Sequence, residues 1–230
     1  MQSQTVHTVL EQIAELEDPR IRSVNEKHGD DHGVNLTKLR ALANSVKKVP
    51  NLGDDLWPLD NTAAQLVAIL ILKPRALNED RLDAMLREAR SPKVRDWFTN
   101  YLAKKSPHRE AIRLRWVKDS NPVVAAAGWE LTAFAVTKST PTLNLDALLD
   151  EIEAHMKDAA EPLQWAMNHT LAEIGIADEE RRPRALEIGE RLGVLRDYPT
   201  SPGCTSPFAP IWITEIVARR SSQENIEKAR

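Results

Sequence analysis

Residues 121–125 of the sequence read Asn-Pro-Val-Val-Ala, and two other stretches, 91–95 (Ser-Pro-Lys-Val-Arg) and 161–165 (Glu-Pro-Leu-Gln-Trp), also place proline directly after a polar residue. Proline suits the first position of a helix, where its missing N–H is not needed and its fixed φ matches the helix. The three prolines are 30 and 40 residues apart. Each stretch therefore predicts the start of a helix, and these starts recur along the chain.

Segments with apolar residues every three to four positions lie on both sides of these starts and predict further helices. Asn78 is a good N-cap residue, because its side chain accepts hydrogen bonds from free backbone N–H groups, so a helix is expected from there to about residue 90. A turn or short helix is expected over residues 51–60. The remaining helices are expected at 5–16, 36–46, 62–72, 107–118, 145–157, 183–192 and 209–220.

Helical pairs that recur every 30 to 40 residues are typical of HEAT-type solenoids. We therefore predict an all-α fold, an α-α superhelix of stacked HEAT-like helical hairpins. The concave face of such a stack is its usual binding surface. A single domain is expected over residues 1–220, and the polar residues 221–230 are expected to form a frayed C-terminal tail.

The composition favours helices and an intracellular location. Among 230 residues, 42% are hydrophobic and 8 are glycine, which suits a helical core better than hairpin-rich sheets. The longest apolar run, 66–72, is far shorter than the roughly 18 residues that span a bilayer, and the first residues lack a signal sequence. The single cysteine, Cys204, cannot form an internal disulfide. We therefore expect a cytoplasmic protein without membrane contact.

Positive charge is concentrated in the middle of the chain. The net charge is −3, from 31 Lys or Arg and 34 Asp or Glu. Residues 73–118 hold 13 Lys or Arg and 6 Asp or Glu, a net charge of +7, so the rest of the chain carries −10. A basic segment in an acidic chain is typical of a site for a polyanion such as DNA, and also of an ordinary solvated helix surface. The charge pattern leaves both interpretations open.

Four stretches, taken together, resemble the DNA alkylation repair family of HEAT-like-repeat proteins. They are 28–40, with the pairs His-Gly, Gly-Val and Leu-Arg; 91–96, Ser-Pro-Lys-Val-Arg-Asp; 119–124, Asp-Ser-Asn-Pro-Val-Val; and 203–212, which begins Gly-Cys-Thr and ends Pro-Ile-Trp. Their order and spacing carry the resemblance, which covers about residues 20–215. It implies DNA as the partner, through the phosphate backbone of an alkylated or branched duplex.

The resemblance implies a monofunctional glycosylase that releases cationic N3- and N7-alkylpurines without fully extruding the base, unlike most base-directed enzymes. Asp96 falls at the position of the family's catalytic aspartate, whose carboxylate stabilises the positive charge that develops on the sugar. Three other site positions depart from the family pattern: Pro92 stands in place of a tryptophan, Ala126 in place of an arginine and His169 in place of a second aromatic residue. Some branches of the family with eroded sites bind damaged or branched DNA without excising bases.

Three functions therefore remain open. The first is a DNA-repair protein that excises alkylated purines with Asp96 at its centre. The second is a non-catalytic binder of damaged or branched DNA on the same scaffold. The third is a protein-binding scaffold, because HEAT stacks often bind proteins. The sequence identifies no protein partner.

Asp96 is expected to share one helix face with Lys93, Asn100 and Lys104, at positions −3, +4 and +8. It is interpreted either as a carboxylate in a basic groove or as a surface residue paired with Lys93. Trp97, the next residue, is interpreted either as an aromatic side chain beside the groove or as a core residue, since tryptophan is mostly buried.

Basic residues continue beyond this helix. Arg109 and Arg113 are four positions apart and are expected to contact phosphates from one face, and His169 is interpreted either as a DNA contact or as a structural histidine. Further candidates are Lys47, Lys48, Arg181, Arg182 and Arg184. The full predicted set comprises Asp96 as the catalytic residue and Lys93, Trp97, Asn100, Lys104, Lys105, Arg109, Arg113 and His169 as DNA-binding residues.

No metal or cofactor site is predicted. His28 and His32 flank two aspartates, a spacing found among metal ligands, but they lie in a glycine-flanked loop and no cysteine pair accompanies them. The sequence has no glycine-rich phosphate loop, nucleophile elbow or metalloprotease helix.

Overall fold

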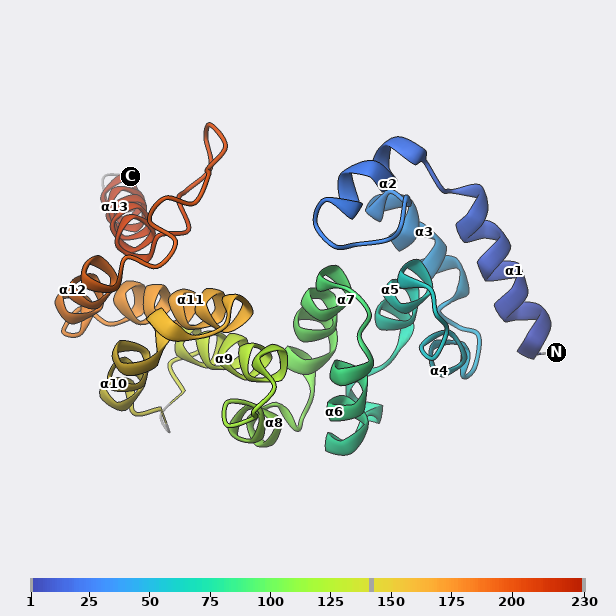
Figure 1. Cartoon of the computed structure of the whole chain (residues 1–230), viewed down its shortest axis with the longest axis horizontal. Helices are drawn as coiled ribbons and strands as arrows, with labels where there is room; N and C mark the ends of the chain where they lie inside the picture. Colours follow the sequence, from blue (N-terminus) through green and yellow to red (C-terminus); the bar gives the residue numbers. More distant parts are fainter. Residues whose placement is uncertain (1, 141–142, 229–230) are drawn as a thin grey trace. The chain divides into compact units, whose positions relative to one another are not determined.

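The computed structural model describes residues 2–140 and 143–228 and divides into two compact units, unit 1 (Met1–Ile112) and unit 2 (Arg113–Arg230). Every regular element in the described residues is helical, apart from an isolated β-bridge between Glu17 and Val34. Neighbouring helices stack as hairpins within each unit (Figure 1). The all-α, HEAT-like prediction is confirmed, and the single domain over 1–220 stays a prediction.

Unit 1 is organised around α5 (Thr62–Ile71), whose residues 62–69 are all buried. Its apolar residues surround the helix almost completely, as expected for a helix covered on every side. The helices α1 (Gln2–Glu15), α3 (Leu36–Val46), α4 (Leu52–Leu56) and α7 (Pro92–Trp97) pack on it. The other elements before α7 are α2 (Pro19–Glu26), η1 (Pro74–Ala76) and α6 (Glu79–Glu88).

The helix that begins at Pro92 changes its winding after six residues. A π-helical turn, η2 (Phe98–Leu102), follows α7 directly, and the 3-10 turn η3 (Ala103–Lys105) follows η2. Phe98 and Leu102 are fully buried, so the core holds this turn in place. The sequence predicts one regular helix here, because the spacing of apolar residues does not reveal a wider turn. Such turns are frequent at functional sites.

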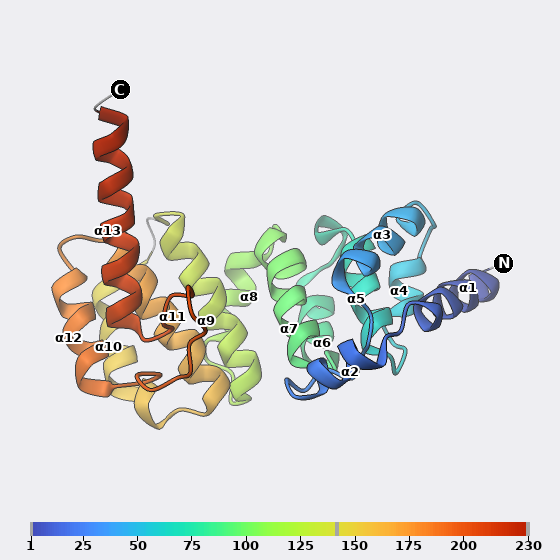
Figure 2. The ribbon, with the colours of Figure 1, turned by 90° about the horizontal axis from the view of Figure 1, so that it is seen from above.

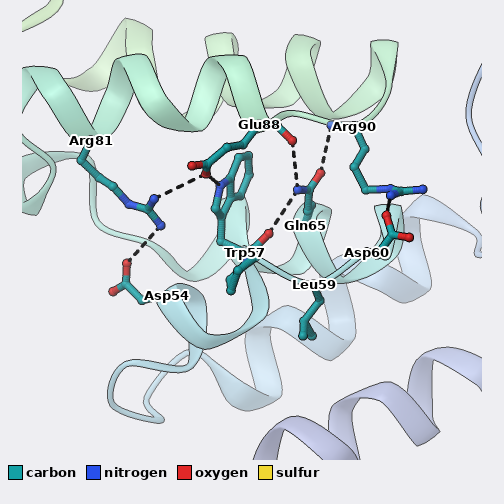
Figure 3. Close-up of a pocket in the computed structure, with 9 residues that line it drawn as sticks. Asp54, Trp57, Leu59, Asp60, Gln65, Arg81, Glu88 and Arg90 are labelled. Atoms are coloured by element: carbon teal, nitrogen blue, oxygen red, sulfur yellow. Dashed lines mark hydrogen bonds and ion pairs between the residues drawn. The ribbon is translucent and has the colours of Figure 1, made fainter.

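A buried glutamine joins three segments of unit 1 (Figure 3). The Gln65 amide nitrogen lies 3.1 Å from the Trp57 carbonyl oxygen and 3.4 Å from that of Glu88, and donates to both. Its amide oxygen accepts from the backbone N–H of Arg90 at 3.1 Å. The Trp57 indole N–H donates to the Glu88 carboxylate at 2.6 Å. Buried polar groups are stable when they are partnered in this way.

An open pocket of about 440 Å³ lies beside this network (Figure 3). Its charged side chains pair with one another. Arg81 lies between Asp54 and Glu88, at 3.8 and 3.5 Å, and Arg90 pairs with Asp60. These ion pairs link α4, α5 and α6. We therefore interpret the pocket as a structural contact between these helices.

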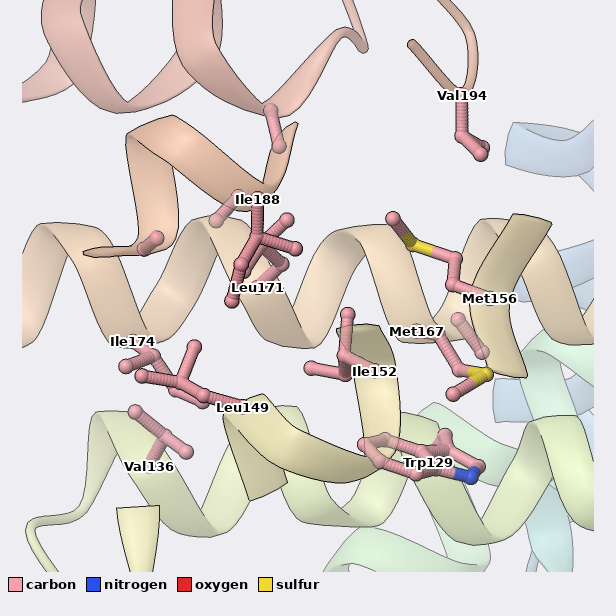
Figure 4. Packing of buried hydrophobic residues seen from close by; sticks show 14 of the residues in the cluster. Trp129, Val136, Leu149, Ile152, Met156, Met167, Leu171, Ile174, Ile188 and Val194 are labelled. Carbon is pink, nitrogen blue, oxygen red and sulfur yellow. The ribbon is translucent and has the colours of Figure 1, made fainter. Parts of the chain in front are cut away.

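Unit 2 is organised by the pairing of α9 (Pro122–Thr137) with α11 (Glu161–Ala177). α12 (Arg182–Leu192) and α13 (Ala209–Lys228) pack on α11, and α10 (Leu145–His155) with the turn η4 (Met156–Asp158) completes the unit. α8 (Arg109–Trp116) spans the boundary between the two units. The buried cluster shown for unit 2 is mostly aliphatic (Figure 4), and includes Trp129, Val136, Leu149, Ile152, Met167, Leu171, Ile174 and Ile188.

All three proline starts form helices, with one difference in capping. Ser91 and Asn121 each accept a hydrogen bond from a backbone N–H of the first turn, at 3.3 and 2.9 Å. At the third start the N-cap residue is Ala160, so Glu161 is the first helical residue and Pro162 the second. The expected polar cap is therefore absent there, and α11 depends on packing rather than on capping.

Two other helices differ from the prediction. Residues 19–26 are mostly polar and predict no helix, but α2 forms there, with the Asp18 carboxylate accepting from the Arg20 N–H at 2.8 Å. α13 continues to Lys228, past the expected end at residue 220, and its second half extends beyond the helices on which its first half packs (Figure 2). Fraying of residues 221–230 stays a prediction. Within the described residues, no helix combines the length and apolar character needed to cross a membrane.

Gly128 marks the place where α9 passes closest to the end of α8. A Cβ atom at this position would lie 2.4 Å from the Val117 backbone nitrogen and 2.7 Å from the Trp116 carbonyl carbon. Because backbone atoms cannot move aside as a side chain can, Gly128→Ala is expected to lower the free energy of unfolding by about 1–3 kcal/mol, as overpacking usually does. Urea denaturation measures this change.

The control is Thr137→Ala at the exposed end of α9, which is expected to change the free energy of unfolding by less than about 0.5 kcal/mol. Equal effects of the two substitutions would show that the contact at Gly128 is not tight.

Candidate nucleic-acid interface

A row of three polar side chains runs along residues 96–104 of unit 1. The Asn100 amide nitrogen donates to the Asp96 carboxylate at 2.8 Å, and the Lys104 ammonium donates to the Asn100 amide oxygen at 2.9 Å. Asp96 and Asn100 are exposed and Lys104 is partly exposed. The spacing of four and eight residues therefore brings these side chains together as expected, even though the π-helical turn intervenes. The row offers both donors and acceptors to a polar ligand.

The loop 27–33 fixes the start of the helix that carries this row. Asp30, only 4% exposed, accepts from the Lys93 backbone N–H at 2.9 Å. Gly29 has a φ of 79°, and a Cβ there would lie 3.3 Å from the Pro92 ring. Burial lowers the pKa of the Arg95 guanidinium, and the charge of Asp30 partly offsets that effect. The contact of Lys93 with the 27–33 loop is therefore made by its backbone N–H.

Glu17 holds the far end of the same loop. Its carboxylate accepts from the Gly33 N–H at 2.9 Å and from the Arg22 guanidinium at 2.9 Å. The Asp18 N–H donates to the Gly33 carbonyl oxygen at 2.9 Å. The loop is therefore tied to unit 1 at both ends.

Two aromatic rings and two cations pack together next to the polar row. Trp97 is 4% exposed, and the centroid of its ring lies 5.4 Å from the centroid of the Tyr101 ring. The Arg40 guanidinium carbon lies 4.6 Å from the centre of the Trp97 ring, and its Nη2 donates to the Tyr101 hydroxyl at 3.3 Å. The Lys105 Nζ lies 5.1 Å from the centre of the Tyr101 ring. The burial of Trp97 fits its interpretation as a core residue. The Arg40 guanidinium covers its ring.

The two arginines of α8 lie in different environments. Arg109 is partly exposed, and its Nη1 donates to the Lys104 carbonyl oxygen at 2.9 Å. Arg113 is only 6% exposed, and its Nη1 donates to the Thr132 hydroxyl at 3.3 Å. The sequence predicts that both face DNA, but the face of α8 that carries Arg113 packs on α9. Arg113 therefore packs within unit 2, and its contact with DNA stays a prediction.

His169 on α11 sits in an acidic and aromatic cluster of unit 2. Its Nδ1 lies 3.0 Å from the Glu130 carboxylate, and its Nε2 lies 3.5 Å from that of Glu173. The ring stacks on Trp212 with the planes 4° apart and the centroids 5.2 Å apart. Burial by itself would lower the pKa of His169, but the hydrogen bonds to Glu130 and Glu173 outweigh it and raise the pKa to about 9. The imidazole is therefore protonated at neutral pH.

A sequence model of the DNA alkylation repair enzyme family matches residues 9–213. The chain belongs to the DNA alkylation repair enzyme family. It is also similar to a solved structure described as belonging to "a new family of proteins related to the HEAT-like repeat DNA glycosylases with affinity for branched DNA structures". The TM-score is 0.75 and the identity 19%, over 93% of this chain and 94% of the other, so the likeness is one of fold. No curated protein matches the chain.

In this member of the alkylation repair family, the side chains at the three positions that depart from the family pattern make contacts within the protein. Pro92 starts α7, with its ring 3.3 Å from the place where a Cβ of residue 29 would lie, and Ala126 is 8% exposed within the core of unit 2. His169 is held by its own carboxylates. The residues that sequence reasoning missed are Arg40, Tyr101, Glu130, Glu173 and Trp212. One signal for Arg40 was present, because it ends the family-like stretch 28–40.

The two histidines of the 27–33 loop differ sharply in exposure. His28 is exposed, whereas His32 is buried and its Nδ1 accepts from the Val34 N–H at 3.3 Å. Burial lowers the pKa of His32. In the part of the chain that the structure describes, no three His, Cys, Asp or Glu side chains converge as metal ligands.

The raised pKa of His169 predicts a pH-dependent contribution to stability. A group whose pKa rises from 6.5 to about 9 on folding stabilises the folded state fully below pH 6.5, and the contribution is lost as the pH rises through 9. It is expected to be about 2–3 kcal/mol, at about 1.4 kcal/mol for each unit of pKa. The free energy of unfolding of wild type and His169→Gln, measured from pH 6 to 10, should differ most at pH 6 and converge near pH 10.

His155→Gln is the matched control, because His155 forms a similar pair with Glu151 but is 64% exposed. That variant should follow wild type at every pH. A constant difference between wild type and His169→Gln from pH 6 to 10 would refute a charged His169.

Proposed function

We propose that this protein binds DNA in the cytoplasm, prefers branched to linear duplexes, and does not excise bases. The observation that carries this proposal is the state of His169. The family resemblance assigns an aromatic contact to this position, but here a protonated imidazole is bound by Glu130 and Glu173 and covered by Trp212. An internal ion pair thus fills the place from which a side chain would support base chemistry.

Binding to DNA is supported by the family and by the polar surface of unit 1. The family acts on DNA, and a neighbour in fold is described as having affinity for branched DNA structures. Lys104 and Arg109 lie on the surface that follows Asp96, within the segment of net charge +7. Lysine and arginine bind phosphates through charge and hydrogen bonds, which gives affinity without dependence on base sequence.

The environments of Trp97 in unit 1 and of Ala126 in unit 2 support the absence of base excision. Trp97 is buried under Arg40, so its ring face is covered by a guanidinium. Ala126 has no group that donates hydrogen bonds, and the core of unit 2 closes over it. A cationic purine would therefore lack the aromatic contacts that stabilise it through cation–π attraction.

The exposed carboxylate of Asp96 favours a second candidate function, excision of alkylated purines. Asn100 holds this carboxylate in one orientation, and a fixed carboxylate stabilises positive charge on a departing sugar.

The binding proposal is tested with fluorescein-labelled DNA of equal length, as a linear duplex and as a four-way junction. We expect tighter binding to the junction. We also expect affinity to fall with salt, because phosphate contacts release counterions, and Lys104→Gln to reduce the slope of log K against log salt by about 0.9. Lys157→Gln, at an exposed position of the turn η4, is the control and should leave the slope unchanged. Binding that does not depend on salt would contradict the proposal.

The absence of base excision is tested by incubating methylated duplex DNA with excess protein. We expect no release of 7-methylguanine from wild type and no difference between wild type and Asp96→Asn. Release by wild type that disappears in Asp96→Asn would establish the second candidate and reject the first. The folding of both proteins is checked by circular dichroism.

A further inference from the structure

The charged groups of Arg40 and Lys105 contact aromatic side chains rather than carboxylates. Both side chains are exposed, and in the described residues neither has a carboxylate oxygen within 4.0 Å. Arg40 contacts the Trp97 ring and the Tyr101 hydroxyl, and Lys105 contacts the Tyr101 ring. These neighbours are uncharged, so both cations keep their full charge at the surface.

Two arginines of unit 2, Arg181 and Arg184, show the opposite arrangement. Arg184 lies 3.0 Å from Glu153 and also pairs with Asp150, and Arg181 lies 2.8 Å from Asp146 and 3.1 Å from Asp178. Carboxylates therefore neutralise these side chains, which makes them less attractive to an anion than Arg40 and Lys105. They serve as matched controls, being surface arginines of the same chain.

The Arg40 guanidinium is fixed in a geometry that suits a phosphate. It lies on the Trp97 ring, while Nη2 donates to Tyr101 and Nη1 contacts the Leu36 carbonyl oxygen at 3.5 Å. A guanidinium has five N–H donors in a planar fork that matches the oxygens of a phosphate, so donors remain after these two contacts. The Tyr101 hydroxyl accepts from Arg40 and keeps its own proton for donation. Lys105 adds a second charge next to the Tyr101 ring.

A purely structural role would explain the contacts between α3 and η2 but not the charges. A contact between two helices is made as well by an uncharged side chain, whereas two like charges that both contact Tyr101 repel each other, and an anion bound to both relieves that repulsion. The tyrosine that both cations contact provides a hydroxyl that can donate to an anion while it accepts from Arg40. The set therefore matches an anionic ligand.

We propose that Arg40, Tyr101 and Lys105 form a phosphate clamp that binds the backbone of one DNA strand beside the Asp96 row. The clamp rests on the proposed function, since it names the contact through which unit 1 holds DNA. Its ligand is a phosphodiester, recognised by charge and by hydrogen bonds to its free oxygens, so the clamp reads no base sequence. Arg40 and Lys105 bind the phosphates, and Tyr101 is a positioning residue that orients Arg40.

The clamp is tested by binding the labelled four-way junction at several salt concentrations. Arg40→Gln and Lys105→Gln are each expected to weaken binding about 10-fold, the effect of losing a hydrogen bond to a charged group. Each is also expected to reduce the salt slope by about 0.9. Tyr101→Phe keeps the ring and removes the hydroxyl, so it is expected to weaken binding about 3-fold without changing the slope. Arg184→Gln should match wild type.

Arg40→Lys separates charge from geometry. It is expected to keep the salt slope of wild type but to bind less tightly, because an ammonium has no planar fork. Thermal unfolding of every variant shows whether unit 1 stays folded, and Tyr101→Phe and Arg40→Lys provide the answer if Arg40→Gln does not fold.

Wild-type binding that all four clamp variants leave unchanged would overturn the clamp alone and leave DNA binding intact. Wild type that binds neither junction nor duplex would overturn the proposed function and the clamp together. A smaller salt slope in Tyr101→Phe would assign the charge effect to a rearranged surface and would also overturn the clamp.

Discussion

The hydrogen bond from the Lys93 N–H to the buried Asp30 carboxylate, 2.9 Å long, sets the geometry on which the surface of unit 1 depends. It fixes the start of the helical stretch 92–105, and therefore the direction in which every side chain of that stretch points. The 27–33 loop that presents Asp30 is tied at its other end to Glu17. A loop without regular structure thus places the groups that meet a ligand, which is a common division of labour in proteins.

The partners of each basic side chain, and not the number of basic residues, decide where positive charge is available to a ligand. Arg184 and Arg191 of α12 pair with acidic residues of α10, which neutralise their positive charge within unit 2. Arg40 and Lys105 lie on aromatic rings instead, which leave their charge available. His169 extends the same rule to a titratable group, since its two carboxylates both create its charge and neutralise it. A count of basic residues along the chain cannot distinguish these cases.

The fold was largely predictable, because the polar-proline starts and the 3.6-residue period are local signals that packing preserves. The helix over 36–46 was predicted to the residue, whereas α2 was missed because its stability comes from a capping aspartate rather than from an apolar face. The site was predictable only where its spacing is local, as for Asp96, Asn100 and Lys104. The contact of Arg40 with Tyr101 joins residues 61 positions apart, and the burial of Arg113 depends on where α9 packs. Neither follows from periodicity.

The packing of Arg40 on Trp97 links recognition to folding. A free arginine side chain loses up to roughly 2 kcal/mol of conformational entropy when a ligand orders it. Here the ring and the tyrosine hydroxyl order the guanidinium as unit 1 folds, before any ligand arrives. Affinity then depends on how firmly α3 is held against η2. A substitution in the core of unit 1, remote from any ligand, would loosen that hold and weaken binding while the protein remained folded, so natural variation in the core can adjust affinity without altering a single contact residue.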